Sequence, residues 1–138
     1  MTDKKLKSHR VKIDKIDKEI YALIQKRASH AVAIGKIKSK VSPKESFYKP
    51  DRETKILRNI LNANKKGLLP DSKIRAIYKE LISGCLSLEE ILKVAYLGPE
   101  ATHSEAAVHN QFGSQALRIP TSTIDDVFYQ VINDDVNL

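Results

Sequence analysis

Apolar residues follow a helical repeat through the first forty positions of the chain. From about Leu6 to Val41 they recur three or four positions apart, as on one face of a helix. The repeating positions are Ile13, Ile16, Ile20, Leu23, Ile24, Ala31, Ile34 and Ile37. At ~1.5 Å per residue, this pattern predicts a helical rod of about 50 Å. Such a helix is long for a small domain, so we expect it to pack against a second copy of itself.

Two further helical patterns follow this first segment. One runs from about Asp51 to the residue before Lys65, and Gly67 is a candidate C-cap. The other begins near Asp71 and continues toward about Leu92. Together these patterns predict an all-α domain of three helices, in the order long, short, long.

The repeat changes after residue 93. Val94–Leu97 is a short apolar run that Gly98-Pro99 ends, which is typical of a buried strand. A helix over about 104–112, a strand near 116–119 and a helix over about 124–132 are predicted next. This β-α-β-α order is the opening of an α/β segment, and two strands fall short of the usual sheet. The predicted division is therefore 1–93 and 94–138.

Composition bounds the class of protein. The chain has 138 residues, enough for one compact domain and a fragment of another. No apolar run approaches the ~20 residues that a membrane span needs, and the basic N-terminus is not followed by the apolar core of a secretory signal. The one cysteine, Cys85, excludes an internal disulfide. We expect a soluble, cytoplasmic protein without a membrane partner.

The charges are distributed unevenly along the chain. Residues 1–93 hold 23 Lys and Arg against 11 Asp and Glu, whereas residues 94–138 hold one against six. A basic unit of this kind favours an anionic partner. Charge alone leaves open whether that partner is a nucleic acid or a small polyanion.

Two cations share the apolar face of the first helix. Arg27 and Lys38 are eleven residues apart, which brings them within ~20° of each other around a helix, with small Ala31 between them. The pair could be side chains that fix the register of a helix–helix contact. It could also be an anion site, since arginine binds a carboxylate through two hydrogen bonds. Arg10 lies about 100° off this face, so only a partner subunit could bring it to the same site.

The sequence contains no motif for metal binding, phosphate binding or nucleophilic catalysis. The four histidines lack metal-ligand spacing, and there is no glycine-rich phosphate loop and no Ser/His/Asp or Cys/His arrangement. We therefore expect neither a metal nor a cofactor. Glu53 and Glu89 would, taken alone, be ordinary surface carboxylates.

Several separated motifs together resemble a known family. They are Arg10-x-x-Ile13-Asp14-x-Ile16-Asp17, Ile24-x-x-Arg27, Ile34-Gly35-x-Ile37-Lys38, Phe47-Tyr48-Lys49-Pro50-Asp51-Arg52-Glu53, Asn64-Lys65-Lys66-Gly67-Leu68-Leu69-Pro70 and Ser83-Gly84-Cys85-Leu86-Ser87-Leu88-Glu89. The set resembles the all-helical chorismate mutases, and most of all those fused to a prephenate dehydratase. Residues 94–106 are similar to the opening of that dehydratase domain.

The resemblance implies a fold, a reaction and a set of site residues. The mutase of this family is an intertwined homodimer that rearranges chorismate to prephenate in aromatic amino acid biosynthesis, on the route to phenylalanine, and it needs no cofactor. By this resemblance, Arg27 and the partner's Arg10 would hold the two substrate carboxylates, and Lys38 would reach the ether oxygen. Glu53 would contact the ring hydroxyl, and a protonated Glu89 would contact the ether oxygen. The residues that would line the pocket are Lys49, Arg52 and Cys85.

The dehydratase-like part departs from the family pattern. Ala101 and His103 stand where the family commonly has glycine and phenylalanine, and the Thr-Arg-Phe catalytic motif does not occur after them. On this basis we expect residues 94–138 to be an incomplete dehydratase domain without activity.

Two alternatives to the mutase remain open at the level of sequence. An isochorismate pyruvate lyase has a similar helical fold and cationic pocket. A basic helical dimer that binds nucleic acid is the other, although its recognition motifs are absent and part of the basic charge faces inward. We expect the mutase, without a nucleic-acid partner.

Overall fold

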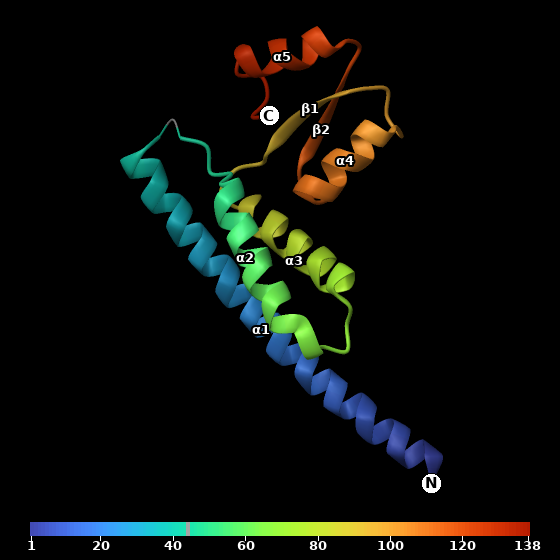
Figure 1. Cartoon of the computed structure of the whole chain (residues 1–138). Coiled ribbons are helices and arrows are strands. Elements are labelled where there is room, and N and C mark those ends of the chain that lie inside the picture. Colours follow the sequence, from blue (N-terminus) through green and yellow to red (C-terminus); the bar gives the residue numbers. More distant parts are fainter. Residues whose placement is uncertain (44) are drawn as a thin grey trace.

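The computed structural model describes residues 1–43 and 45–138. Its helices and strands follow the predicted order closely (Figure 1). The elements are α1 (Thr2–Val41), α2 (Pro50–Ala63), the short 3₁₀ helix η1 (Asn64–Lys66), α3 (Asp71–Leu86), β1 (Lys93–Leu97), α4 (His103–Phe112), β2 (Leu117–Thr121) and α5 (Ile124–Ile132).

The first three α-helices form an open, elongated unit. Helices α2 and α3 pack against each other beside the C-terminal half of α1, while the N-terminal half of α1 extends beyond them (Figure 1). Only Gly35 is buried along the whole of α1. The predicted rod is therefore present, and most of its apolar face is exposed within residues 1–43 and 45–138.

Two helix ends differ from the prediction. Helix α3 stops at Leu86 instead of near Leu92, since the backbone N–H groups of Leu88 and Glu89 bond to carbonyls three residues back instead of four, at 3.2 Å to Cys85 O and 2.9 Å to Leu86 O. Glu89 thus lies in the turn after α3 and not on the helix itself. At the end of α2, Gly67 follows η1 with φ −73°, so it is not a left-handed C-cap of α2.

The second unit is a small α/β layer. Strands β1 and β2 pair in parallel, with Lys93 opposite Leu117 and Leu97 opposite Thr121, and α4 is the crossover between them. Helix α4 begins with a side-chain cap, since Thr102 Oγ1 accepts from Glu105 N and Glu105 Oε2 accepts from Ala101 N at 2.5 Å.

Most of the buried apolar side chains in the described residues belong to this second unit. A cluster of Leu92, Val94, Tyr96, Val108 and Ala116 forms its core. Three partly buried residues pack on this cluster, and two of them come from the helical unit: Tyr48, Leu86 and Phe112. The two units therefore pack against each other.

No helix in the described ranges 1–43 and 45–138 is long and apolar enough to cross a membrane.

Candidate active site

A cavity of about 290 Å³ lies where α1, the 45–49 loop, α2 and the end of α3 meet. Cations, carboxylates and apolar side chains share its wall. The lining residues are Arg27, His30, Ala31, Ile34, Lys38, Phe47, Tyr48, Lys49, Arg52, Glu53, Ile56, Ile82, Cys85, Leu86 and Glu89. Every predicted substrate-binding residue except Arg10 is among them.

Helix α1 supplies one wall through a single face. Arg27, Ala31, Ile34 and Lys38 all line the cavity, as the helical repeat predicts. Neither Arg27 nor Lys38 takes part in an ion pair within the described parts of the chain. Their charges are thus available to an anion in the cavity. The Lys38 ammonium also lies 5.7 Å from the centre of the Phe47 ring, a cation–π contact.

Helix α2 places Arg52 and Glu53 at its first turn. Pro50 begins the helix at a position where its missing N–H costs nothing. Glu53 is buried, with 9% of its surface exposed, and its Oε1 pairs with the Lys79 ammonium of α3. This ion pair offsets the desolvation of both charges and fixes the carboxylate at the edge of the cavity.

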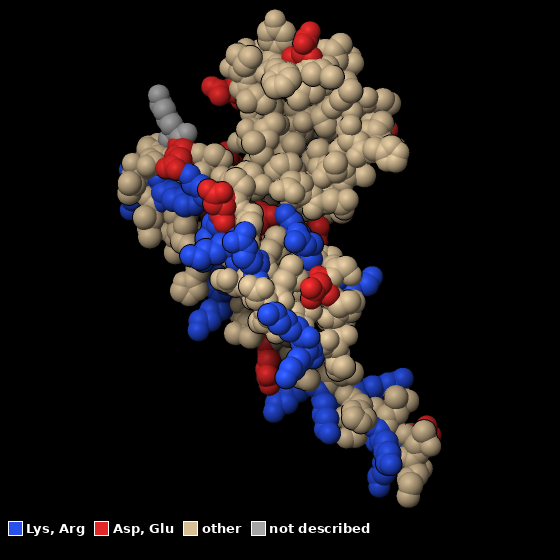
Figure 2. Space-filling view, in the orientation of Figure 1, with Lys and Arg blue, Asp and Glu red and all other residues tan. Residues whose placement is uncertain are grey.

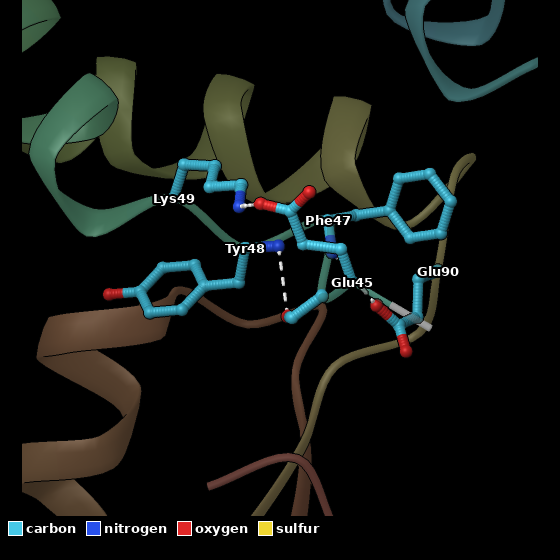
Figure 3. A network of polar contacts seen from close by, with 6 residues as sticks. Glu45, Phe47, Tyr48, Lys49 and Glu90 are labelled. Carbon is cyan, nitrogen blue, oxygen red and sulfur yellow. Dashed lines mark hydrogen bonds and ion pairs between the residues drawn. The ribbon is translucent and has the colours of Figure 1, made fainter. Parts of the chain in front are cut away.

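The 45–49 loop closes the cavity and is held by polar contacts (Figure 3). Lys49 pairs with the exposed Glu45, whose pKa lies below its ordinary value because of that contact. The Phe47 backbone N–H donates to Glu90 Oε2 at 3.4 Å. Tyr48 points away from Lys49, toward α4, and burial raises the pKa of its hydroxyl. Since Glu45 already neutralises Lys49, this lysine contributes less free charge to the cavity than Lys38 does.

The Glu89 carboxyl group lines the cavity with one oxygen buried and a raised pKa. Its Oε2 is buried and has no hydrogen-bond partner in the described chain. Burial raises the pKa of Glu89 above its ordinary value, and the Lys38 ammonium pulls it part of the way back. A protonated Glu89 would present an O–H donor to the cavity.

Cys85 lies on α3 at the base of the cavity, with 6% of its surface exposed. It adds a small apolar surface between Ile82 and Glu89.

Arg10 lies outside this cavity. It is on the part of α1 that extends beyond α2 and α3, seventeen residues before Arg27 and thus roughly 25 Å away along the helix. The structure therefore leaves the cavity without the second arginine that the resemblance implies.

His30, Tyr48 and Lys79 are among the residues of this site that sequence reasoning missed. His30 follows Arg27 by three positions on the same helix face, so the helical repeat was a sufficient signal for it. Tyr48 lies within a quoted motif, but nothing in its spacing shows that it lines the cavity. Lys79 is the partner of Glu53, and this contact spans 26 positions of the sequence.

No cluster of three or more His, Cys, Asp and Glu side chains suited to a metal occurs in residues 1–43 and 45–138. The cavity is instead a cationic site with two carboxylates. In the view of Figure 2, Lys and Arg side chains are concentrated on the helical unit, while the second unit shows mostly uncharged and some acidic surface.

Comparisons with known proteins give two family matches. Residues 9–90 match the family described as chorismate mutase type II, and residues 94–138 match the family described as prephenate dehydratase. No solved structure matched the chain significantly.

Curated relatives match both parts of the chain at once. A protein named bifunctional chorismate mutase/prephenate dehydratase from Aquifex aeolicus is 46% identical over 129 residues, which are 91% of this chain and 35% of the relative. The protein of the same name from Stutzerimonas stutzeri is 41% identical over 135 residues, or 96% of this chain and 37% of the relative. The chain thus spans little more than a third of the length of these relatives.

Proposed function

The chain belongs to the chorismate mutase type II family, and we propose that it rearranges chorismate to prephenate in the cavity at the end of α1. Residues 1–93 would form the mutase unit, and residues 94–138 the dehydratase-like unit. The cytoplasmic location stays a prediction from the sequence.

The reaction suits a cationic cavity. Chorismate is a dianion, and its rearrangement breaks an ether C–O bond while a C–C bond forms, without an external nucleophile, proton or metal. An enzyme accelerates such a step by holding the reactive conformer and by stabilising the negative charge that develops on the ether oxygen. Arg27 and Lys38, which have no ion-pair partner in the described chain, supply that stabilisation.

Two donors would flank the ether oxygen. The Lys38 ammonium is one of them. A protonated Glu89 is the other, because an ionised carboxylate would repel the developing charge. The raised pKa of Glu89 supports this role, since burial favours the neutral form.

The other lining residues would hold the rest of the substrate. Glu53 would accept a hydrogen bond from the ring hydroxyl, since Lys79 already fixes its carboxylate. Arg52 and Lys49 would add positive charge around the dianion, and Cys85 would pack against its apolar part.

The second substrate carboxylate would be bound by Arg10 of the partner subunit. Helix α1 exposes a continuous apolar face for a second copy, and its side chains remain about half exposed in the single chain, for example Ile13 at 55%, Ile16 at 52% and Ile20 at 48%. A homodimer that covers this face would carry two equivalent sites. Each site would take Arg27 from one protomer and Arg10 from the other.

The single observation that carries the proposal is the meeting of Arg27, Lys38 and Glu89 in one cavity from two separate elements. Purified protein should convert chorismate to prephenate, with the product identified by chromatography. Isochorismate is the matched control substrate. Release of pyruvate and salicylate from isochorismate, without prephenate from chorismate, would identify a lyase instead and contradict the proposal.

A further inference from the structure

The second unit borders the candidate site, although none of the residues that line the cavity belongs to it. Three lining residues nevertheless make contacts that end in residues 94–138. These three are Phe47, Tyr48 and Glu53. Each of the contacts runs across a large separation in sequence.

Glu53 is connected to α4 through Lys79. The Lys79 ammonium is nearly buried, pairs with Glu53 Oε1 and donates to the backbone carbonyl of Gln111 at 2.9 Å. Gln111 lies in the last turn of α4. Because the same ammonium donates to both groups, the position of this carbonyl helps to set the position of the Glu53 carboxylate.

The end of α4 is itself held tightly against α3. Gly113 has φ +76°, and a Cβ there would come within 2.6 Å of Ser83 Cβ. The next residue, Ser114, donates its backbone N–H to Glu80 Oε1 at 2.9 Å. Because Lys79, Glu80 and Ser83 follow one another on one side of α3, the position of the α4 end is closely defined.

The 45–49 loop has two further contacts with the second unit. The Tyr48 ring meets the Phe112 ring edge-on, with centroids 5.4 Å apart. Glu90 connects the other end of the loop, since its Oε2 accepts from Phe47 N and its Oε1 accepts from Asn137 Nδ2 at 2.9 Å. Figure 3 shows Tyr48 directed toward α4 and Glu90 beside the Phe47 backbone.

We infer that residues 94–138 act as a scaffold for the cavity, with Lys79 and Glu90 as positioning residues and Phe112 as the support of Tyr48. This inference rests on the proposed function for the identity of the ligand. It adds that three groups of the second unit outside the cavity set how well the first unit binds the substrate: the Gln111 carbonyl, the Phe112 ring and the Asn137 amide.

The first test does not require activity. The ¹³C resonance of the Glu53 carboxyl, assigned with Glu53→Gln, is compared in the 138-residue chain and in variants of the second unit. Gly113→Ala should shift this resonance because the new methyl group forces α4 away from Ser83. If Gly113→Ala does not fold, Phe112→Leu gives the same test. An unchanged resonance in a folded variant would overturn the inference.

The second test is steady-state kinetics with chorismate. Phe112→Leu and Lys79→Met should each raise KM about tenfold and change kcat less than about twofold, because Glu53 would bind the ground state and the transition state alike. Phe128→Leu and Lys73→Met are the matched controls, as both residues are exposed on the same two units, and they should leave KM unchanged. Lys79→Arg should restore much of the affinity.

Failure of the proposed function and failure of the scaffold give different results. A wild-type chain without chorismate turnover contradicts the proposed function, and the carboxyl resonance still decides whether the second unit holds Glu53. An active wild type in which Phe112→Leu and Lys79→Met behave like their controls contradicts the scaffold. A loss of affinity that Lys79→Arg does not restore, accompanied by a lower kcat and a lower Tm, would show general destabilisation. That result would also contradict the scaffold.

Discussion

The backbone of Gly35 lies against the side chain of Glu89, so closely that a Cβ on Gly35 would come within 3.1 Å of Glu89 Cγ. Gly35 is the buried residue of α1, and it allows the turn after α3 to approach that helix. This approach places the Glu89 carboxyl beside Lys38 and shields its Oε2 from water. The proposed donor thus depends on the absence of a side chain one helical turn before Lys38.

A methyl group at Gly35 should harm activity more than stability. In Gly35→Ala, better helix propensity contributes up to about 1 kcal/mol, while the Glu89 side chain has to move by a few tenths of an ångström. We expect the free energy of unfolding to change by less than about 1 kcal/mol and kcat to fall several-fold. Urea denaturation and chorismate kinetics on the same samples measure both. Gly84→Ala, on α3 with nothing within 4 Å of the added methyl group, is the control and should retain full kcat.

The pH profile should report the protonation of Glu89. Because burial raises its pKa, the neutral donor is present at low pH and is lost as pH rises through the raised value. The wild-type kcat should therefore decline with rising pH. Glu89→Gln keeps a neutral donor at every pH, so its profile should be flat in this range. A variant that retains the wild-type decline would remove Glu89 from the mechanism.

The same shift predicts a change in stability. A carboxyl whose pKa is raised by folding stabilises the native state fully at low pH, and this contribution is lost as pH rises through the folded-state value. Glu89→Gln should accordingly raise Tm relative to wild type at pH 8 by more than it does at pH 4. Equal differences at both pH values would show that Glu89 titrates normally in the folded protein.

The contribution of Glu80 to folding stability should depend on pH in the opposite direction to that of Glu89. Hydrogen bonds from Ser114 lower its pKa, so it stabilises the fold above its ordinary pKa and loses that contribution as pH falls through the lowered value. We expect Ser114→Ala to lower Tm at pH 7 by more than it does at pH 3. Thermal unfolding followed by circular dichroism measures this, and a loss of the same size at pH 3 would contradict the assignment.

Complementation between two inactive variants tests the shared site. Arg10→Ala and Arg27→Ala homodimers should each be strongly impaired. Random exchange of their subunits gives mixed dimers in half of the population, and each mixed dimer has one site with both arginines. The mixture should therefore recover about a quarter of the wild-type activity. No recovery in samples proven to exchange subunits would place Arg10 outside the site.

Much of the fold was predictable because its signals are local. The repeat of Ile13, Ile16 and Ile20 sets the long helix, and Pro43 and Pro50 bracket the loop after it. The apolar pattern predicts the end of α3 too far along the chain, since it continues past Leu86 while the backbone hydrogen bonds tighten to an i→i−3 pattern at Leu88 and Glu89.

The candidate site was predictable in part for the same reason. Helix geometry alone puts Arg27 and Lys38 on one face, whereas the pairing of Glu53 with Lys79 depends on how α2 and α3 pack. The contact of Tyr48 with Phe112 spans both units, and no periodicity along the chain encodes such a contact.

The rate of prephenate formation by Lys38→Ala, compared with wild type at equal protein concentration, tests the central claim most directly. Lys38 faces the cavity without an ion-pair partner in the described residues, so its loss should remove a donor to the developing charge on the ether oxygen. We predict a fall in kcat of about 10²–10³ with the fold intact by circular dichroism. A fall of less than about tenfold would contradict the electrostatic account of this site.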